Sequence, residues 1–343
     1  MSPIRAAIIG YGRNGSTMHA GGVEHNPDMV MAAVCDIDPA RREQASQRFG
    51  CPVFADYRQM LAEVKPDLAI VVTRSDQHCA MTCDCLAAGT NVLVTKPWAV
   101  DAAEAARMVR AARSSRGLLL PWLPVRWACD YLRLGELLAE QAVGKVFLIR
   151  RCCTSFGMRN DWQTERKFGG GYILNWGPHI VDPAVLLGRA PVRSVYGQTR
   201  KAINPGDAED LFMAMITLDG GTLLQTEYSV CVPHLPNWFI QGDRGTIIVH
   251  GKELTLHRHI PALPDDPTQY AAMRASDATV VKETLAGDIY GDTNLIYRDI
   301  AAAVLGQKPY PIRPEDAYEL SVTLQAIRDS AAADTVLHPD YSL

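Results

Sequence analysis

The chain has 343 residues, too many for one ordinary hydrophobic core, and its 48% hydrophobic and 21% charged content is typical of a globular protein with two domains. A formal net charge of −4 excludes the strongly basic surface that would attract nucleic acid or an anionic membrane, so neither is an expected partner. No apolar run approaches the ~20 residues of a bilayer span, and the first residues lack a signal-peptide pattern, so we expect a cytoplasmic protein.

The first third of the chain alternates short apolar runs with helical patterns, as a parallel sheet flanked by helices requires. Strands are expected at 4–9, 30–35, 68–72, 91–95 and 118–121. Helices are expected near 14–25, 39–48, 57–63, 77–88 and 101–115. Prolines punctuate residues 121–124, so we place a first domain at 1–122 and a second at 123–343.

The second part is typical of an α+β domain with a mostly antiparallel open sheet, which follows the doubly wound parallel sheet (Rossmann fold, α/β) of the first. Helices are expected around 126–140, 171–187, 291–305 and 314–333. Strands are expected at 146–152, 193–200, 211–218, 222–230, 237–241, 245–250 and 253–259. Glycine-containing turns such as 219–221 join neighbours as hairpins. Residues 260–290 contain prolines and aspartates and are expected to form an extended surface loop.

The clearest functional signal is a glycine turn directly after the first predicted strand, with an acidic residue at the end of the second. This order predicts a dinucleotide-binding unit, in which the first glycine permits the turn, the second admits a pyrophosphate and the third allows close packing. The helix that follows offers free N–H groups to the phosphates, and the acid lies at the spacing that suits a ribose diol. The predicted cofactor contacts here are Gly10, Gly12, Arg13, Asn14, Gly15 and Asp36.

A second candidate group lies at the ends of the later parallel strands. Thr95-Lys96-Pro97 follows the strand at 91–95, and ligands in doubly wound sheets bind beyond the carboxyl ends of strands. From position alone, a solvent-exposed lysine is an equally good interpretation. The predicted cofactor contacts of this region, on the nicotinamide side, are Thr73, Arg74, His78, Lys96 and Pro97.

Five segments in order resemble the Gfo/Idh/MocA family of oxidoreductases: the glycine turn, residues 73–78, residues 88–92, Lys96-Pro97, and the run from Gly169 to Asp182. The resemblance spans nearly the whole chain and implies NAD(P)-dependent hydride transfer on a sugar, a polyol or a related alcohol. The family's lysine-proline motif usually begins with glutamate, where this chain has Thr95. Its substrate helix usually carries an aspartate four residues before the histidine, where this chain has Asn175.

Lys96, His179 and Asn175 are the predicted catalytic residues. A neutral histidine can accept the proton of a substrate hydroxyl, and a lysine ammonium can stabilise the developing alkoxide. Asn175 and His179 share one face of a helix, and we expect Asn175 to bind a substrate hydroxyl while His179 acts as the general base. Asp182 is expected to orient the His179 ring. An exposed helix position is the alternative for Asn175.

Aromatic side chains near these motifs predict a sugar-binding surface, because sugars pack their C–H faces on rings. Burial between the two domains is an equally good interpretation of each ring taken singly. The predicted substrate contacts are Trp98, Arg126, Trp162, Tyr172 and Trp176. No metal site is expected, and the group from His78 to Cys85 is interpreted as helix packing.

Asp36 favours NAD over NADP, because a carboxylate repels a 2′-phosphate. We expect an NAD-dependent dehydrogenase of a small sugar or polyol, assembled as a homodimer or homotetramer. Two alternatives remain open at this point. One is an enzyme that holds NAD tightly and uses transient oxidation for glycoside cleavage or epimerisation. The other is a non-catalytic sensor of the dinucleotide.

Overall fold

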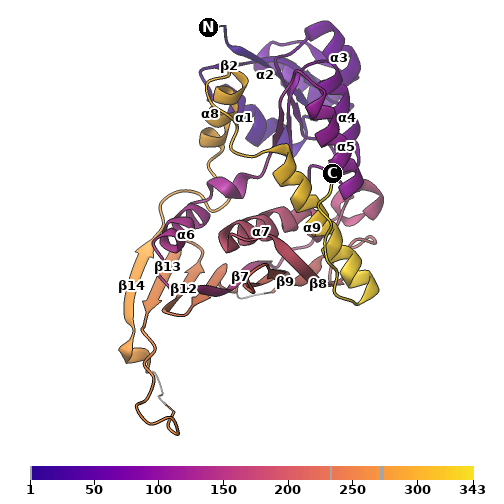
Figure 1. The fold of residues 1–343 in the computed structure, drawn as a ribbon. Helices are drawn as coiled ribbons and strands as arrows, with labels where there is room; N and C mark the ends of the chain where they lie inside the picture. Colours follow the sequence, from indigo (N-terminus) through magenta and orange to yellow (C-terminus); the bar gives the residue numbers. More distant parts are fainter. Residues whose placement is uncertain (1, 232–233, 271–273) are drawn as a thin grey trace.

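The computed structural model describes residues 2–231, 234–270 and 274–343, and it contains two sheets with helices around them (Figure 1). The first sheet has the strand order β3-β2-β1-β4-β5-β6, all parallel, which is the order of a Rossmann fold. This confirms the predicted fold class of the first part. Its strands are β1 (Ile4–Ile9), β2 (Met29–Cys35), β3 (Val53–Phe54), β4 (Leu68–Val71), β5 (Asn91–Val94) and β6 (Leu119–Pro121).

Three helices of this part, α2, α3 and α5, begin at a capping aspartate. Asp38 accepts a hydrogen bond from the Ala40 N–H at the start of α2, and Gly50 ends that helix in the left-handed conformation. The helix expected at 14–25 is divided into a π-helical turn η1 and a short α1. The helices are η1 (Gly15–His19), α1 (Ala20–Glu24), α2 (Pro39–Phe49), α3 (Tyr57–Val64), α4 (Ser75–Ala87) and α5 (Ala102–Arg113).

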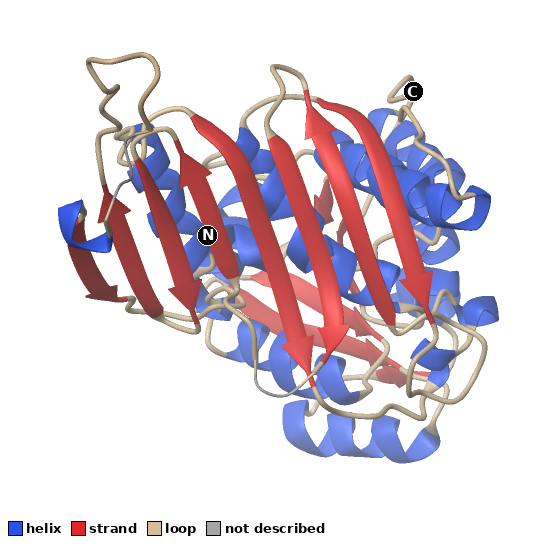
Figure 2. Ribbon diagram, turned by 90° about the horizontal axis from the view of Figure 1, so that it is seen from below, coloured by secondary structure: helices blue, strands red, loops and turns tan. Residues whose placement is uncertain are grey.

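The second sheet has the order β14-β13-β12-β11-β7-β10-β9-β8 and is antiparallel except where β7 pairs with β10. The long helix α7 and the helix α9 pack on one face, whereas no helix among the described residues covers the other face (Figure 2). The strands are β7 (Val146–Ser155), β8 (Val192–Arg200), β9 (Leu211–Leu218), β10 (Leu223–Val230), β11 (Trp238–Gly242), β12 (Gly245–His250), β13 (Glu253–Arg258) and β14 (Thr279–Thr284). The helices are α6 (Cys129–Ala139), α7 (Tyr172–Gly188), α8 (Thr293–Val304) and α9 (Pro314–Ala333), with short turns η2 (Pro124–Trp127), η3 (Trp162–Thr164), η4 (Arg166–Phe168) and η5 (Ala275–Asp277).

Two strands were not expected from the sequence. The expectation of one continuous loop over 260–290 is wrong, because β14 lies within it and pairs with β13 along its whole length. β3 was missed because it has only two residues, too few for an alternating pattern. Both depend on a neighbouring strand for their hydrogen bonds, which a local pattern does not reveal.

The closing helices connect the two parts of the chain. α8 packs beside α1 (Figure 1), and its Ile296, Tyr297 and Ile300 share a core with Ile4 and Ile8 of the first sheet. α9 contacts both α5 and β8. Residues near the C-terminus therefore complete the core of the first domain, although the sequence places them far beyond its predicted boundary at 122.

Candidate active site

The glycine turn after β1 brings backbone segments into close contact. Gly10 has a φ of +98°, and a Cβ there would lie 2.7 Å from the Val72 carbonyl oxygen. A Cβ on Gly15 would lie 2.0 Å from the Gly10 carbonyl oxygen, so these two glycines are required by close packing. A Cβ on Gly12 would meet only the Arg41 side chain, at 3.4 Å. The exposed side chains of Arg13 and Asn14 complete this turn, and the whole arrangement fits a bound pyrophosphate.

Asp36 is buried beside this turn and is held by backbone groups. Its carboxylate accepts hydrogen bonds from the Tyr11 N–H at 2.7 Å and the Asp38 N–H at 2.9 Å. The Arg41 guanidinium lies 3.6 Å from the same carboxylate and is about half exposed. The Asp36 carboxylate, an acceptor for a ribose hydroxyl, therefore lies beside the Arg41 cation at the edge of the turn.

Lys96 follows β5 and is held in place by its neighbours. Its Nζ donates to the Asn175 side-chain oxygen at 2.7 Å and to the Asn175 carbonyl at 2.9 Å. The ring of His78 lies within hydrogen-bond distance of the Pro97 carbonyl, at 2.8 Å, and the Thr73 carbonyl, at 3.0 Å. His78 is only 1% exposed, and its ring supports the Lys96-Pro97 turn.

Asn175 and His179 lie on one face of α7, as their spacing predicts, and both are 8% exposed. Within the described residues, neither ring nitrogen of His179 has a hydrogen-bond partner. The expected partner, Asp182, is paired with Arg126 instead. The structure therefore brings the lysine, the amide and the histidine together from two different domains.

Burial changes the ionisation of the two titratable groups of this site. Burial, followed by the positive charges of Arg159 and Arg13, lowers the pKa of Lys96 to about 7. Burial, followed by the charges of Lys96 and Arg151, holds the pKa of His179 well below its usual value. Near neutral pH the histidine is uncharged, while the lysine changes its protonation state.

An aromatic wall lies against His179. The Trp176 ring stacks on Tyr228 with centroids 5.0 Å apart and meets the His179 ring at 5.8 Å. Tyr290, which is 48% exposed, lies 6.1 Å from His179 and 6.2 Å from Trp176. Trp162 is half-buried on the preceding loop, whereas Tyr172 is buried edge-on to Tyr228 and accepts from the Asn204 amide.

Sequence reasoning missed Tyr290 and Arg151. Arg151 on β7 is 2% exposed, and its charge contributes to the low pKa of His179. Its Nη1 reaches Asp130 at 3.3 Å, and its guanidinium lies 4.4 Å from the centre of the Trp238 ring, but its Nε has no partner within the described residues. No local motif marks either residue, because one lies in a strand and the other in a long connection.

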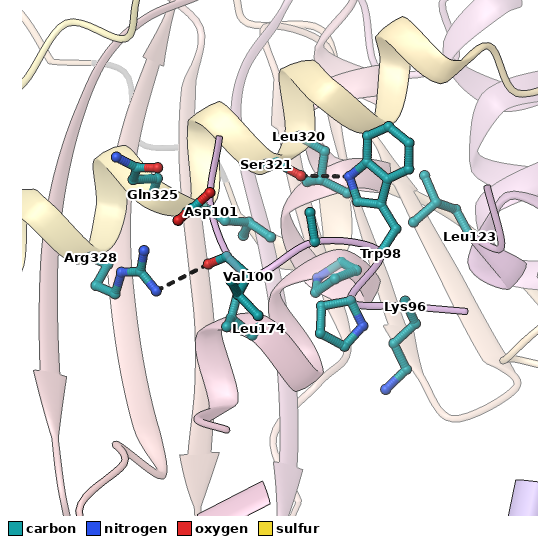
Figure 3. A pocket seen from close by; sticks show the side chains of 14 residues that line it. Lys96, Trp98, Val100, Asp101, Leu123, Leu174, Leu320, Ser321, Gln325 and Arg328 are labelled. Atoms are coloured by element: carbon teal, nitrogen blue, oxygen red, sulfur yellow. Dashed lines mark hydrogen bonds between the residues drawn. The ribbon is translucent and has the colours of Figure 1, made fainter. Parts of the chain in front are cut away.

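Two predicted substrate contacts face elsewhere. Trp98 points away from Lys96 toward α9 and donates to the Ser321 hydroxyl at 2.7 Å (Figure 3). Trp98 therefore packs between domains, as the alternative interpretation held. Arg126 is buried and pairs with Asp182 at 2.8 Å and Asp316 at 3.1 Å, so its donors are engaged within the protein. The polar groups of both side chains therefore already have partners within the protein.

Two further members of the predicted site, Thr73 and Arg74, lie near the Lys96-Pro97 turn, and Arg74 also contacts the second domain. The Arg74 guanidinium pairs with Asp76 and lies 4.0 Å from the centre of the Phe168 ring in η4. Thr73 is partly buried, and its backbone carbonyl faces the His78 ring. Arg74 thus holds the loop before α7 against the first domain.

Comparison with known proteins matches both parts of the chain to one family. Residues 4–121 match the model described as an oxidoreductase family with an NAD-binding Rossmann fold. Residues 131–248 match the GFO/IDH/MocA C-terminal domain. No helix among the described residues is long and apolar enough to cross a membrane.

Individual relatives are moderately similar. The uncharacterised oxidoreductase YdgJ of Escherichia coli is 24% identical over 338 residues, which are 96% of each chain. D-glucoside 3-dehydrogenase of the same organism is 30% identical over 202 residues, which are 57% of each chain. The WlbA dehydrogenase of Chromobacterium violaceum, solved with NADH and UDP-GlcNAcA, superposes with a TM-score of 0.84 at 22% identity and covers 100% of this chain and 98% of its own.

Proposed function

Since the chain belongs to the Gfo/Idh/MocA family of oxidoreductases, we propose that it transfers a hydride between NAD and a hydroxyl carbon of a sugar, polyol or inositol-type substrate. The observation that carries the proposal is the meeting of Lys96, Asn175 and His179 beside the glycine turn. Arg13 of that turn is close enough for its charge to act on Lys96. A substrate at Lys96 is therefore within reach of a dinucleotide bound at the turn.

Lys96 is the proposed proton acceptor for the substrate hydroxyl. A base must be unprotonated when substrate binds and must hold a proton afterwards, and a group with a pKa of about 7 does both near neutral pH. His179 is a weaker base, since the same cations that lower its pKa oppose an imidazolium. We therefore assign it the hydrogen bond that orients the hydroxyl, which revises the role expected from the sequence.

Asn175 influences the protonation state of Lys96. Its amide oxygen accepts from Nζ without adding negative charge, whereas a carboxylate at this position would favour the ammonium form. When bound, NAD⁺ supplies the hydride acceptor. The protein then has to hold the hydroxyl between Lys96 and His179 and shield it from water, and the half-buried rings of Trp176 and Tyr290 suit the C–H face of a sugar.

NAD is the proposed cofactor in preference to NADP. The carboxylate of Asp36 lies at the end of β2 and is tied to the glycine turn through the Tyr11 N–H. A ribose diol can donate to such a carboxylate, whereas a 2′-phosphate would be repelled by it. The neighbouring Arg41 moderates this preference, because it would offset part of the repulsion.

The direct test is spectroscopic. Purified protein is mixed with NAD and a panel of polyols, inositols and sugars, and the absorbance of reduced nicotinamide is followed. At least one compound should give a rise that Lys96→Met abolishes. Binding of NADH without turnover of any panel member would contradict the proposed chemistry. Failure to bind NADH would contradict the cofactor assignment as well.

We further propose that the uncovered face of the second sheet joins two copies of the chain. Met213 and Met215 alternate with buried residues of β9 and are 42% and 41% exposed on this face. Exposed apolar side chains on a broad flat surface are typical of a buried interface. Sedimentation should show a dimer or tetramer, and Met213→Glu combined with Met215→Glu should convert it to monomer. A wild-type monomer would contradict the assembly.

A further inference from the structure

The segment from His78 to Cys85 contains a pair of thiols that the proposed catalytic chemistry does not use. Cys79 and Cys83 lie one turn apart on α4, and the Cys79 thiol donates to the Glu104 carbonyl of α5 at 3.5 Å. The Nε of Arg107, on the neighbouring helix α5, donates to the Cys79 sulfur at 3.0 Å. We propose that Cys79 and Cys83 form a redox-active dithiol, oxidised to a disulfide by a peroxide, and that its oxidation weakens cofactor binding.

The two sulfurs have different roles. The neighbouring Cys79 side chain lowers the pKa of Cys83 to about 7, and Arg107 acts in the same direction, against burial and the charge of Asp84. The Cys83 side chain and burial raise the pKa of Cys79. Cys83 therefore supplies the nucleophilic thiolate, and Cys79 is the resolving thiol.

Access and spacing both permit the reaction. Cys83 is partly exposed and lines an open groove of about 490 Å³ between the C-terminal ends of α4 and α5, which admits a small oxidant. Four residues of an α-helix rise about 6 Å, which lies within the Cα separations of known disulfides. Cys85 is fully buried, and burial raises its pKa to about 12, so it is the matched unreactive thiol on the same helix.

The chemistry balances with one peroxide. The Cys83 thiolate attacks one peroxide oxygen, so an S–O bond forms, the O–O bond breaks, and hydroxide leaves and is protonated to water. The Cys79 thiol then loses its proton, and its sulfur attacks the Cys83 sulfur. An S–S bond forms, the S–O bond breaks and a second water leaves. Two thiols are oxidised and one peroxide is reduced.

The pair is connected to the proposed active site through one residue. Cys79 directly follows His78, whose ring lies between the Thr73 and Pro97 carbonyls and supports the turn of Lys96. A disulfide draws the two Cβ atoms closer than a helical turn leaves them. The turn of α4 that carries His78 must adjust, and its hydrogen bond to the Pro97 carbonyl is weakened.

The test compares wild type, Cys83→Ala and Cys85→Ala before and after exposure to hydrogen peroxide. Alkylation, digestion and fragment-ion mass spectrometry should find a disulfide between Cys79 and Cys83 in wild type and Cys85→Ala, and none in Cys83→Ala. Iodoacetamide should modify Cys83 at pH 7 faster than Cys129, which is also partly exposed but whose pKa is raised by burial. A missing disulfide, or equal alkylation rates, would overturn the site.

The connection to the cofactor is measured separately by NADH fluorescence titration. Oxidised wild type should bind NADH about fivefold more weakly than reduced wild type, the loss expected when one hydrogen bond is weakened. Cys83→Ala should not respond to peroxide. A disulfide that leaves NADH affinity unchanged would overturn the connection. The peroxide experiment with mass detection does not depend on NADH binding, so its result stands apart from the proposed enzymatic function.

Discussion

The two halves of α7 differ in how their buried polar groups are paired. In its C-terminal half, Asp182 forms a bidentate pair with Arg126, which also binds Asp316. In its N-terminal half, Asn175 faces a lysine whose pKa is displaced, and His179 has no hydrogen-bond partner within the described residues. Removing one partner of a buried ion pair destabilises a fold, whereas polar groups left without partners are available to a ligand. The difference separates the residues that hold the domains together from those that can do chemistry.

The largest effect should follow from removing Arg126, the cation that pairs with Asp182 in the C-terminal half of α7. Arg126→Met leaves Asp182 buried without a cation and leaves Asp316 with Arg313 alone, which should cost about 3–5 kcal/mol of unfolding free energy. Urea denaturation measures this loss. Arg313→Met is the matched control, because Arg313 binds the same Asp316 but is 70% exposed, and it should cost below about 1 kcal/mol. Equal losses in the two variants would contradict a special role for the buried pair.

Substitution of Lys96, which faces the N-terminal half of α7, should lower activity without lowering stability. Lys96→Met removes the proposed proton acceptor and should lower turnover at least ~100-fold, with the unfolding midpoint nearly unchanged. Lys96→Arg keeps the charge but cannot release a proton at neutral pH, so it should be about as inactive. Steady-state rates of both variants distinguish proton transfer from charge stabilisation as the role of Lys96. If Lys96→Arg kept more than about a tenth of the activity, charge stabilisation rather than proton transfer would be its function.

His179→Ala should have a smaller effect than Lys96→Met. The loss of one orienting hydrogen bond predicts a decrease in turnover of about tenfold. His179→Gln, which restores a hydrogen-bonding group, should recover part of the lost turnover. A loss of ~100-fold or more would return the role of general base to the histidine.

Asn175→Asp tests why the pKa of Lys96 lies near neutrality. A carboxylate against Nζ favours the ammonium, so the pKa of Lys96 should rise by about one unit. Because oxidation needs the neutral lysine, the rising limb of kcat/KM against pH should move to higher pH, and activity at pH 7 should fall. Asn175→Ser, which adds no charge, should leave the position of the limb near that of wild type. An unmoved limb in Asn175→Asp would mean that another group titrates.

The sequence predicts the local geometry of the chain better than it predicts which distant residues contact a given side chain. The glycine turn and the shared face of Asn175 and His179 depend on neighbouring residues, and the structure has both. Trp98 and Arg126 were expected to contact substrate because of their side-chain types, yet both are engaged by α9, more than 180 residues further along the chain. Arg151 and Tyr290 were missed for the complementary reason, since only the tertiary fold brings them beside His179.

The smallest effect concerns the choice between cofactors at the other end of the site. Arg41 lies beside Asp36 and the open side of Gly12, where a 2′-phosphate would lie, but it is 47% exposed. Arg41→Ala should therefore weaken NADPH binding by about threefold and leave NADH binding unchanged, as expected for an exposed ion pair. Arg42 serves as the control, because its Nη1 donates to the Asp36 and Ile37 carbonyls and shapes the turn itself. Arg42→Ala should weaken both cofactors alike, and fluorescence titration of the two variants distinguishes phosphate recognition from turn geometry. A selective loss of NADPH binding in Arg42→Ala would reverse this assignment.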